Sequence, residues 1–209
     1  MKQLVIIGAG GFGREVHNMV PFCRRYGEQF VIKGFINDNT DALEGYAGYA
    51  PIIGTIRDYV PEPDDVFICA IGDIEGRKKC AQMLLSRGAE FISLVHKTAG
   101  WDRNTVVGRG CILCTRVGIS CDCKIGDFTI FQDECLVGHD TVIGEFCHFH
   151  ARAFVAGRVV MGNEVHVGPY ALIHPDKKIG SSATVGAGSF VIRNVKSGST
   201  VYGNPAKKL

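Results

Sequence analysis

The sequence predicts an α/β domain followed by a parallel β-helix, and two patterns support this fold class. From Val107 to Val191 every sixth residue is apolar, and such a six-residue repeat is typical of a parallel β-helix. Ahead of the repeat, an apolar run at residues 3–7 is followed by the sequence GAGGFG (Gly8–Gly13) and then by a helical pattern. We therefore divide the chain into residues 1–95 and residues 96–209.

The first half predicts alternating strands and helices. Phe12, Val16 and Met19 fall at helical spacing, and Pro21 should bend or end that helix. The strand-helix-strand order favours a parallel sheet with right-handed crossovers. We expect strands at residues 3–7, 30–36, 66–71 and near 91–94, and a second helix at residues 75–87.

A nucleotide sugar is the ligand that the first half predicts best. Backbone N–H groups at a helix start can bind a diphosphate, and Asp38 lies 25 residues after Gly13, close to the place of a ribose-binding acid. About 95 residues make only half of a dinucleotide-binding domain, which disfavours NAD. The alternative is that the glycines only form a tight turn. The candidate substrate-binding residues are Gly10, Gly11, Phe12, Asp38, Gly72 and Asp73.

The apolar residues at six-residue spacing form the predicted core of the second half. A small residue usually follows each, which we interpret as room for a tight corner. Cys111, Cys123, Cys135 and Cys147 recur in a second slot, where we interpret them as small core residues. The spacing Cys111-x-x-Cys114 would also fit half of a zinc site. The fifteen core positions are Val107, Leu113, Ile119, Ile125, Phe131, Val137, Ile143, Phe149, Val155, Met161, Val167, Ile173, Ile179, Val185 and Val191.

Composition excludes several classes of protein. Hydrophobic residues make up 46% of the chain and charged residues 21%, as in ordinary globular proteins. The net charge of +2 predicts no nucleic-acid partner, and no stretch approaches the roughly 18 apolar residues of a membrane span. The N-terminus runs straight into an apolar strand, so we expect no signal peptide. Nine cysteines without a secretory signal predict reduced thiols and a cytoplasmic location.

The repeat resembles that of the left-handed β-helix acyltransferases, the hexapeptide transferase superfamily. There, three hexapeptides close one triangular coil, so about five coils would fit into residues 101–194, with no insertion. A half-Rossmann domain ahead of such a helix resembles the sugar O-acyltransferase family, which includes sialic acid O-acetyltransferases and bacterial acetyltransferases of UDP-4-amino sugars. The matching motifs are Gly8–Gly13, Ala70–Asp73, Leu94–Lys97, Val137–Asp140 and the tail Gly203–Lys207.

The resemblance implies that His139 is a general base and that Asp140 orients it. The pattern agrees, because His139 lies two residues after the inward-facing Val137 and should point outward. Gly157, stacked one coil later, leaves room beside the imidazole. Histidine suits proton removal from an amine or hydroxyl at neutral pH. Alternatively, Asp140 would be a solvated carboxylate paired with Arg158, the residue stacked above it.

The resemblance also implies an acetyl-CoA site between neighbouring prisms of a homotrimer. Acetyl transfer from a thioester needs positioning, a base and an oxyanion donor, so we expect neither a cysteine nucleophile nor a metal. Arg152, Lys177, Lys207 or Lys208 would meet the CoA phosphates. The candidate cofactor-binding residues are His148, Gly157, Gly168, Pro169, Gly186 and Ala187.

The remaining histidines have structural interpretations. A zinc site of the carbonic anhydrase type is matched only loosely, by His148-x-His150. We expect His166 beside His148 on an outer wall, His150 and His174 at exposed corners, His17 on a helix surface and His96 at the domain junction.

The predicted function is acetyl-CoA-dependent transfer of an acetyl group to the amine of a nucleotide-linked amino sugar, in bacterial surface glycan biosynthesis. An O-acetyltransferase acting on sialic acid or a related sugar is one alternative. A non-catalytic binding module built from the same two domains is another.

Overall fold

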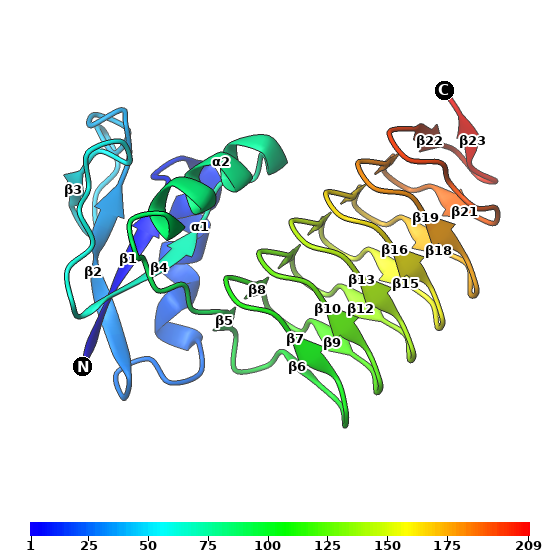
Figure 1. Ribbon diagram of the computed structural model, residues 1–209, viewed down its shortest axis with the longest axis horizontal. Coiled ribbons are helices and arrows are strands. Elements are labelled where there is room, and N and C mark those ends of the chain that lie inside the picture. The colour runs from blue at the N-terminus through cyan, green and yellow to red at the C-terminus, as the bar shows by residue number, and fades with distance from the viewer. The chain divides into compact units, whose positions relative to one another are not determined.

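The computed structural model describes residues 1–209 and divides into two compact units, Met1–Leu94 and Val95–Leu209. Figure 1 shows a mixed α/β unit at the N-terminus and a stack of coils in the C-terminal unit. No helix combines the length and the apolar character that a membrane span requires.

The N-terminal unit is a four-stranded parallel sheet with the order β3-β2-β1-β4. The strands β1 and β4 bury most of their apolar side chains, as is typical of parallel sheets that are covered on both faces. The strands are β1 (Lys2–Ile7), β2 (Phe30–Ile36), β3 (Ile52–Gly54) and β4 (Asp65–Cys69). The helices are α1 (Gly11–Met19), the 3₁₀ helix η1 (Val20–Phe22) and α2 (Ile74–Leu85).

Pro21 ends the first helix, as expected, because α1 stops at Met19 and the chain continues as the 3₁₀ turn η1. Two expectations for this half were wrong. The three-residue strand β3 was not predicted, since it is too short to show a pattern. The strand expected near residues 91–94 is reduced to one bridge between Phe67 and Phe91.

The next strand, β5 (Leu94–Val95), belongs to a sheet of the C-terminal unit. That unit has three parallel walls. The six-stranded sheet holds β6 (Gly100–Trp101), β9 (Gly118–Ile119), β12 (Leu136–Val137), β15 (Phe154–Val155), β18 (Leu172–Ile173) and β21 (Phe190–Val191). The five-stranded sheet holds β7 (Val106–Val107), β10 (Lys124–Ile125), β13 (Val142–Ile143), β16 (Val160–Met161) and β19 (Lys178–Ile179).

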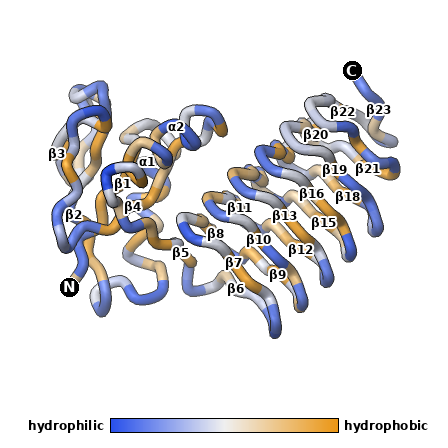
Figure 2. The backbone as a smooth tube through the Cα atoms, viewed as in Figure 1, coloured by the Kyte–Doolittle hydropathy of each residue, from blue (hydrophilic) through white to orange (hydrophobic).

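The eight-stranded sheet contains β5 and an antiparallel strand at its other edge. Its remaining members are β8 (Ile112–Leu113), β11 (Ile130–Phe131), β14 (His148–Phe149), β17 (His166–Val167), β20 (Thr184–Val185), β22 (Thr200–Tyr202) and β23 (Lys207–Lys208). From β6 to β21, successive strands of a wall pair residues 18 apart, for example Ile125 with Ile143, so three hexapeptides make one coil. Figure 2 shows hydrophobic strands joined by hydrophilic turns.

The predicted core positions face the inside of this prism. Val107 is half-buried and the other fourteen are buried. The second slot was also predicted correctly, since Cys111, Cys123, Cys135 and Cys147 are buried and form no disulfide. Their thiols donate to backbone carbonyls one coil later, as Cys123 Sγ does to Gly138 O at 3.2 Å. Burial raises the pKa of Cys135 to about 12, so that thiol stays protonated and unreactive.

The corners differ from the expectation. The glycine after each core residue does not take the left-handed conformation. That conformation belongs to the third residue after the core position, for example Asp122 (φ 60°) and Asp140 (φ 57°). The glycines are needed because the next coil lies against them: a Cβ at Gly138 would stand 2.5 Å from the Gly157 backbone nitrogen. Close stacking of coils therefore requires these small residues.

Candidate active site

His139 lies at the corner between β12 and β13, two residues after the buried Val137. Its side chain points outward as predicted and is 48% exposed. Gly157 lies beneath the ring, because a Cβ at that position would stand 2.7 Å from His139 Nε2. The glycine thus gives the imidazole its place on the surface of the next coil.

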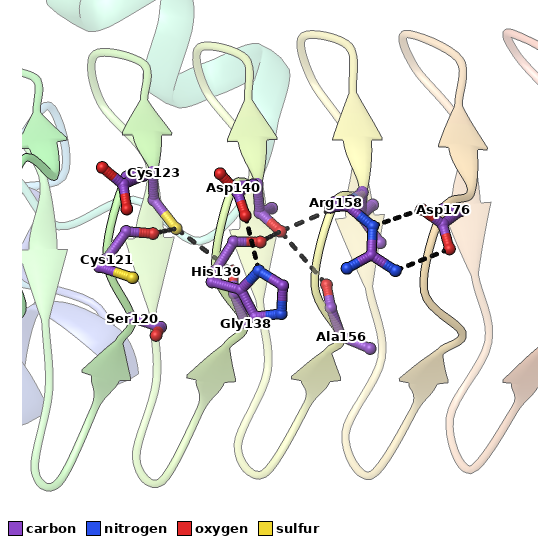
Figure 3. A network of polar contacts seen from close by, with 12 residues as sticks. Ser120, Cys121, Cys123, Gly138, His139, Asp140, Ala156, Arg158 and Asp176 are labelled. Carbon is purple, nitrogen blue, oxygen red and sulfur yellow. Dashed lines mark hydrogen bonds and ion pairs between the residues drawn. The ribbon is translucent and has the colours of Figure 1, made fainter.

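Asp140 contacts the other ring nitrogen. Its Oδ2 lies 2.6 Å from His139 Nδ1, and a dashed line marks this contact in Figure 3. This contact favours the tautomer with hydrogen on Nδ1, which leaves Nε2 free to accept a proton. The alternative pairing of Asp140 with Arg158 is not observed. Arg158 instead donates from Nε to Asp176 Oδ1 at 2.7 Å.

Cys121 lies one coil before His139 and is the half-exposed thiol of this region. A hydrogen bond to Asp122 raises its pKa, because the neighbouring carboxylate disfavours a thiolate. A protonated thiol is a poor nucleophile. The chemistry available at this corner is therefore that of the His139–Asp140 pair.

Two exposed apolar faces flank the His139 corner. On the six-stranded sheet Leu136, Phe154 and Leu172 are exposed, and on the five-stranded sheet Val142 and Val160 are exposed. A groove of about 270 Å³ runs over the first face and reaches Gly138. Exposed apolar stripes of this kind mark surfaces that bind another molecule.

The candidate cofactor residue His148 lies in a cluster of three imidazoles. Its ring stacks on His150, with 4.3 Å between ring centroids, and meets His166 edge-on at 5.9 Å. Only 3% of His148 is exposed, which disfavours direct contact with a thioester in this conformation. His150 is not the exposed corner that the sequence predicted, since it is half-buried between the other two rings.

Burial and the neighbouring His166 lower the pKa of His150, so this ring resists protonation. No group of three or more metal-binding side chains is arranged around a common point.

The sequence analysis also made predictions for two histidines outside this cluster. His174 is exposed, as expected, whereas His17 is half-buried, stacks on Phe35 and accepts from Ala50 N–H at 3.2 Å. These ring contacts join side chains on neighbouring elements, so the spacing of residues along the sequence did not predict them.

The other candidate cofactor residues lie one coil apart. Gly168 is buried against the backbone of Gly186 and Ala187, since a Cβ on it would stand 2.6 Å from Ala187 N. A Cβ on Gly186 would stand 2.5 Å from the Tyr202 ring. Pro169 is half-buried and Ala187 is exposed. Coil stacking is thus a sufficient reason for the glycines, and Ala187 is the one candidate cofactor residue that is exposed.

The basic candidates fall into two groups. Arg152 already has partners within the prism: its Nε donates to Glu134 Oε2 at 2.7 Å, and its Nη1 donates to the Tyr170 hydroxyl. Lys207 and Lys208 line a cavity of about 290 Å³ at the C-terminal end of the prism. Arg193 and Lys196 also line this cavity, so four basic side chains surround it. Neither of these two residues was predicted from the sequence.

In the N-terminal unit, the predicted ligand residues gather at one edge of the sheet. Gly8–Gly10 follow β1, Asp38 follows β2 and Gly72 follows β4, and parallel strands bring their carboxyl ends to the same edge. A Cβ on Gly10 or Gly11 would meet no atom within 4 Å. The start of α1 is therefore open, as an anion site requires.

Residues beside the glycine loop fix the backbone at this edge of the N-terminal sheet. A Cβ on Gly13 would stand 2.0 Å from Gly8 O, so the helix lies directly against the turn. Asn37, which the sequence analysis did not single out, accepts from Ala9 N–H at 3.1 Å. Asp38 accepts from Arg57 N–H at 3.1 Å. The run Asn37-Asp38-Asn39 is typical of an Asx turn, and this pattern was the signal in the sequence that could have singled out Asn37.

Asp73 has a structural contact of its own. Its Oδ2 caps α2 by accepting from Gly76 N–H at 2.7 Å. The Arg77 side chain is fully buried and donates to the carbonyl oxygens of Ile71 and Gly72, which fixes the loop after β4. Phe12 is half-buried in the first turn of α1.

Part of the chain is similar in sequence to known proteins. Residues 3–84 match the family model of the PglD N-terminal domain. The UDP-N-acetylbacillosamine N-acetyltransferase of Bacillus subtilis is 29% identical over 117 residues, which are 54% of this chain and 51% of that protein. An uncharacterized protein of Acanthamoeba polyphaga mimivirus is 30% identical over 125 residues, 60% of this chain and 24% of that protein. The chain thus spans about half, or less, of these curated relatives.

Solved structures match over the whole chain. The acetyltransferase domain of PglB from Neisseria gonorrhoeae has a TM-score of 0.90 and 27% identity, with both chains covered completely. The same domain in complex with acetyl coenzyme A has a TM-score of 0.89 and 27% identity, covering 100% of this chain and 99% of the other. PerB from Caulobacter crescentus, in complex with CoA and GDP-perosamine, has a TM-score of 0.88 and 27% identity, covering 100% and 98%.

Proposed function

We propose that this chain, which is similar over its whole length to solved sugar acetyltransferases, transfers an acetyl group from acetyl-CoA to the amine of a nucleotide-linked amino sugar. The observation that carries the proposal is the outward imidazole of His139, with Asp140 at 2.6 Å from Nδ1 and Gly157 beneath Nε2. The similar structures that hold acetyl coenzyme A, and CoA with GDP-perosamine, support both substrates.

In the proposed reaction the sugar amine attacks the thioester carbonyl carbon. His139 Nε2 takes the proton that the amine nitrogen loses as the C–N bond forms. The C–S bond then breaks, and the CoA sulfur leaves and is protonated. Asp140 holds the imidazole in the tautomer with a free Nε2 and stabilises the imidazolium that forms.

The N-terminal unit would bind the nucleotide diphosphate. The start of α1 has no side-chain cap, and a Cβ at Gly10 or Gly11 would meet no atom within 4 Å, which leaves room for an anion at the helix start. Asp38, Gly72 and Asp73 lie at the same edge of the sheet, where such sheets bind ligands. We place the enzyme in the cytoplasm, because activated amino sugars and acetyl-CoA are both present there. We further propose that it acts in the biosynthesis of a bacterial surface glycan.

The direct test is turnover of acetyl-CoA with UDP-, dTDP- and GDP-linked 4-amino sugars, with free sialic acid assayed beside them. Release of CoA with any of the amino sugars supports the proposal. Turnover with sialic acid alone would favour an O-acetyltransferase. Binding of a nucleotide sugar without turnover of any substrate would favour a binding module.

Gly11→Val tests the nucleotide-sugar site. The Cβ of the new side chain would meet no atom within 4 Å, so the fold should persist while the approach of a phosphate is obstructed. We expect the KM for the sugar nucleotide to rise about tenfold or more, with the KM for acetyl-CoA near wild type. Gly13→Ala is the contrasting variant and should unfold the unit, because its Cβ would stand 2.0 Å from Gly8 O. Equal changes in both KM values would contradict the assignment.

We also propose a homotrimer with the acetyl-CoA site between subunits, since the exposed apolar faces beside His139 need a cover. Light scattering at micromolar concentration should give three times the 22.6 kDa chain mass. Phe154→Glu should dissociate the assembly and abolish turnover, whereas Val60→Glu, which changes an exposed apolar residue of the other unit, should do neither. An active 22.6 kDa species would refute the trimer.

A further inference from the structure

Asp140 belongs to a column of corner residues, one per coil. The column runs through Asn104, Asp122, Asp140, Arg158 and Asp176, and all five have φ between 57° and 62°. Backbone hydrogen bonds fix neighbouring corners to each other: Arg158 N–H donates to His139 O at 2.8 Å, and Asp176 N–H donates to Gly157 O at 3.2 Å. These side chains are therefore held one coil apart.

Arg158 stands between two carboxylates, Asp140 in the preceding coil and Asp176 in the following coil (Figure 3). Its guanidinium binds Asp176 in a bidentate manner, through Nε at 2.7 Å and Nη2 at 3.0 Å. That hydrogen bond is the main cause of the raised pKa of Arg158, and the charge of Asp140 adds a smaller contribution. The guanidinium is thus drawn away from His139.

The other neighbour of Asp140 in the column is also occupied. Asp122 accepts from Asn104 Nδ2 at 2.9 Å, and this bond is the main cause of its lowered pKa. With Asp122 and Arg158 both engaged elsewhere, Asp140 keeps its 2.6 Å contact with His139.

We propose that Asp176 is a positioning residue for acetyl transfer: by holding the Arg158 guanidinium in the following coil, it leaves Asp140 to orient His139. The inference rests on the proposed role of His139 as the base. Without a carboxylate at position 176, the carboxylate that still acts on Arg158 is Asp140. A bidentate guanidinium contact competes well against the single bond from an imidazole. His139 would then lose the partner that selects its tautomer.

Asp176→Asn should therefore lower kcat while the fold is kept. The side chains of Arg158 and Asp176 are about half exposed, at 52% and 58%, and exposed ion pairs are weak. We expect kcat to fall by ~3–10-fold with the KM for acetyl-CoA near wild type. High salt should reduce the loss, because it screens the released guanidinium.

Two further variants separate this role from a structural one. The double variant Arg158→Gln/Asp176→Asn removes the competing guanidinium and should restore kcat to within about twofold of wild type. Asp127→Asn is the matched control, since it removes an ion pair of the same 18-residue spacing at another corner, with Arg109 Nε at 3.0 Å. It should leave kcat unchanged.

Nitrogen NMR of histidine-labelled protein gives a readout that does not depend on activity, with His139→Ala assigning the signal. The wild type should show a protonated Nδ1 and a bare Nε2, Asp176→Asn a mixture of tautomers, and the double variant the wild-type pattern. An unchanged spectrum in Asp176→Asn, or a loss of kcat that persists in the double variant, would overturn the inference. Full activity of His139→Ala would overturn the proposed base instead, and would leave the tautomer result standing.

Discussion

Replacing His139 by alanine is expected to lower kcat by ~10²–10⁴, the usual contribution of a positioned general base. The fold should persist, because the side chain points outward and fills no core position. Binding of acetyl-CoA should also persist, because the imidazole is assigned to proton transfer and not to the cosubstrate. The measurement is steady-state kinetics with both substrates, together with thermal unfolding of wild type and variant.

Asp140→Asn is the graded companion to this experiment. An amide can still contact His139 Nδ1 but does not stabilise the imidazolium, so the loss in kcat should be smaller than for His139→Ala. A His139→Ala enzyme that keeps more than about a tenth of the wild-type kcat would show that another group deprotonates the amine. In that case His148, which stacks on His150, becomes the next residue to replace.

Gly157→Ala is expected to lower kcat by ~10²-fold through geometry alone. The new methyl group would stand 2.7 Å from His139 Nε2, whereas carbon atoms in contact lie roughly 3.5–4.0 Å apart. The exposed ring would therefore move aside by about 1 Å, and a displacement of that size can cost about 10²-fold in rate. Thermal stability should hold or rise slightly, because alanine reduces the entropy of the unfolded chain.

Gly118→Ala is the matched control for this variant. Its Cβ would stand 3.0 Å from Leu136 Cδ2, which is again the end of a flexible side chain, but His139 is not involved. We expect near-normal kcat from it. If Gly157 only lines the path of acetyl-CoA, Gly157→Ala would instead raise the KM for acetyl-CoA with kcat unchanged. The two variants together therefore decide whether the glycine serves the base or the cosubstrate.

The site was partly predictable. His139 could be placed because Val137 fixes the register of its coil, and register decides which side chains point outward. The contact of Asp38 could not, because it depends on the backbone N–H of Arg57, 19 residues away. The contact of Asp73 was open to prediction, since an aspartate just before a helix is a typical N-cap. The cluster of His148, His150 and His166 was missed as well, since stacking depends on ring rotamers that spacing does not set.

The sequence by itself determined the prism, because a six-residue period places residues such as Ile125 and Ile143 on the inside of a β-helix. It also determined the α/β unit, through the apolar run at residues 3–7, the glycines after it and the helical spacing that follows. Only the tertiary structure decided which neighbour each corner residue binds. Asp140, Arg158 and Asp176 recur at equal spacing, so sequence position made Asp140 and Asp176 equal partners for Arg158. In the structure the Arg158 guanidinium binds Asp176, and Asp140 contacts His139. Contacts in three dimensions, which equal spacing does not set, therefore distinguish the two carboxylates.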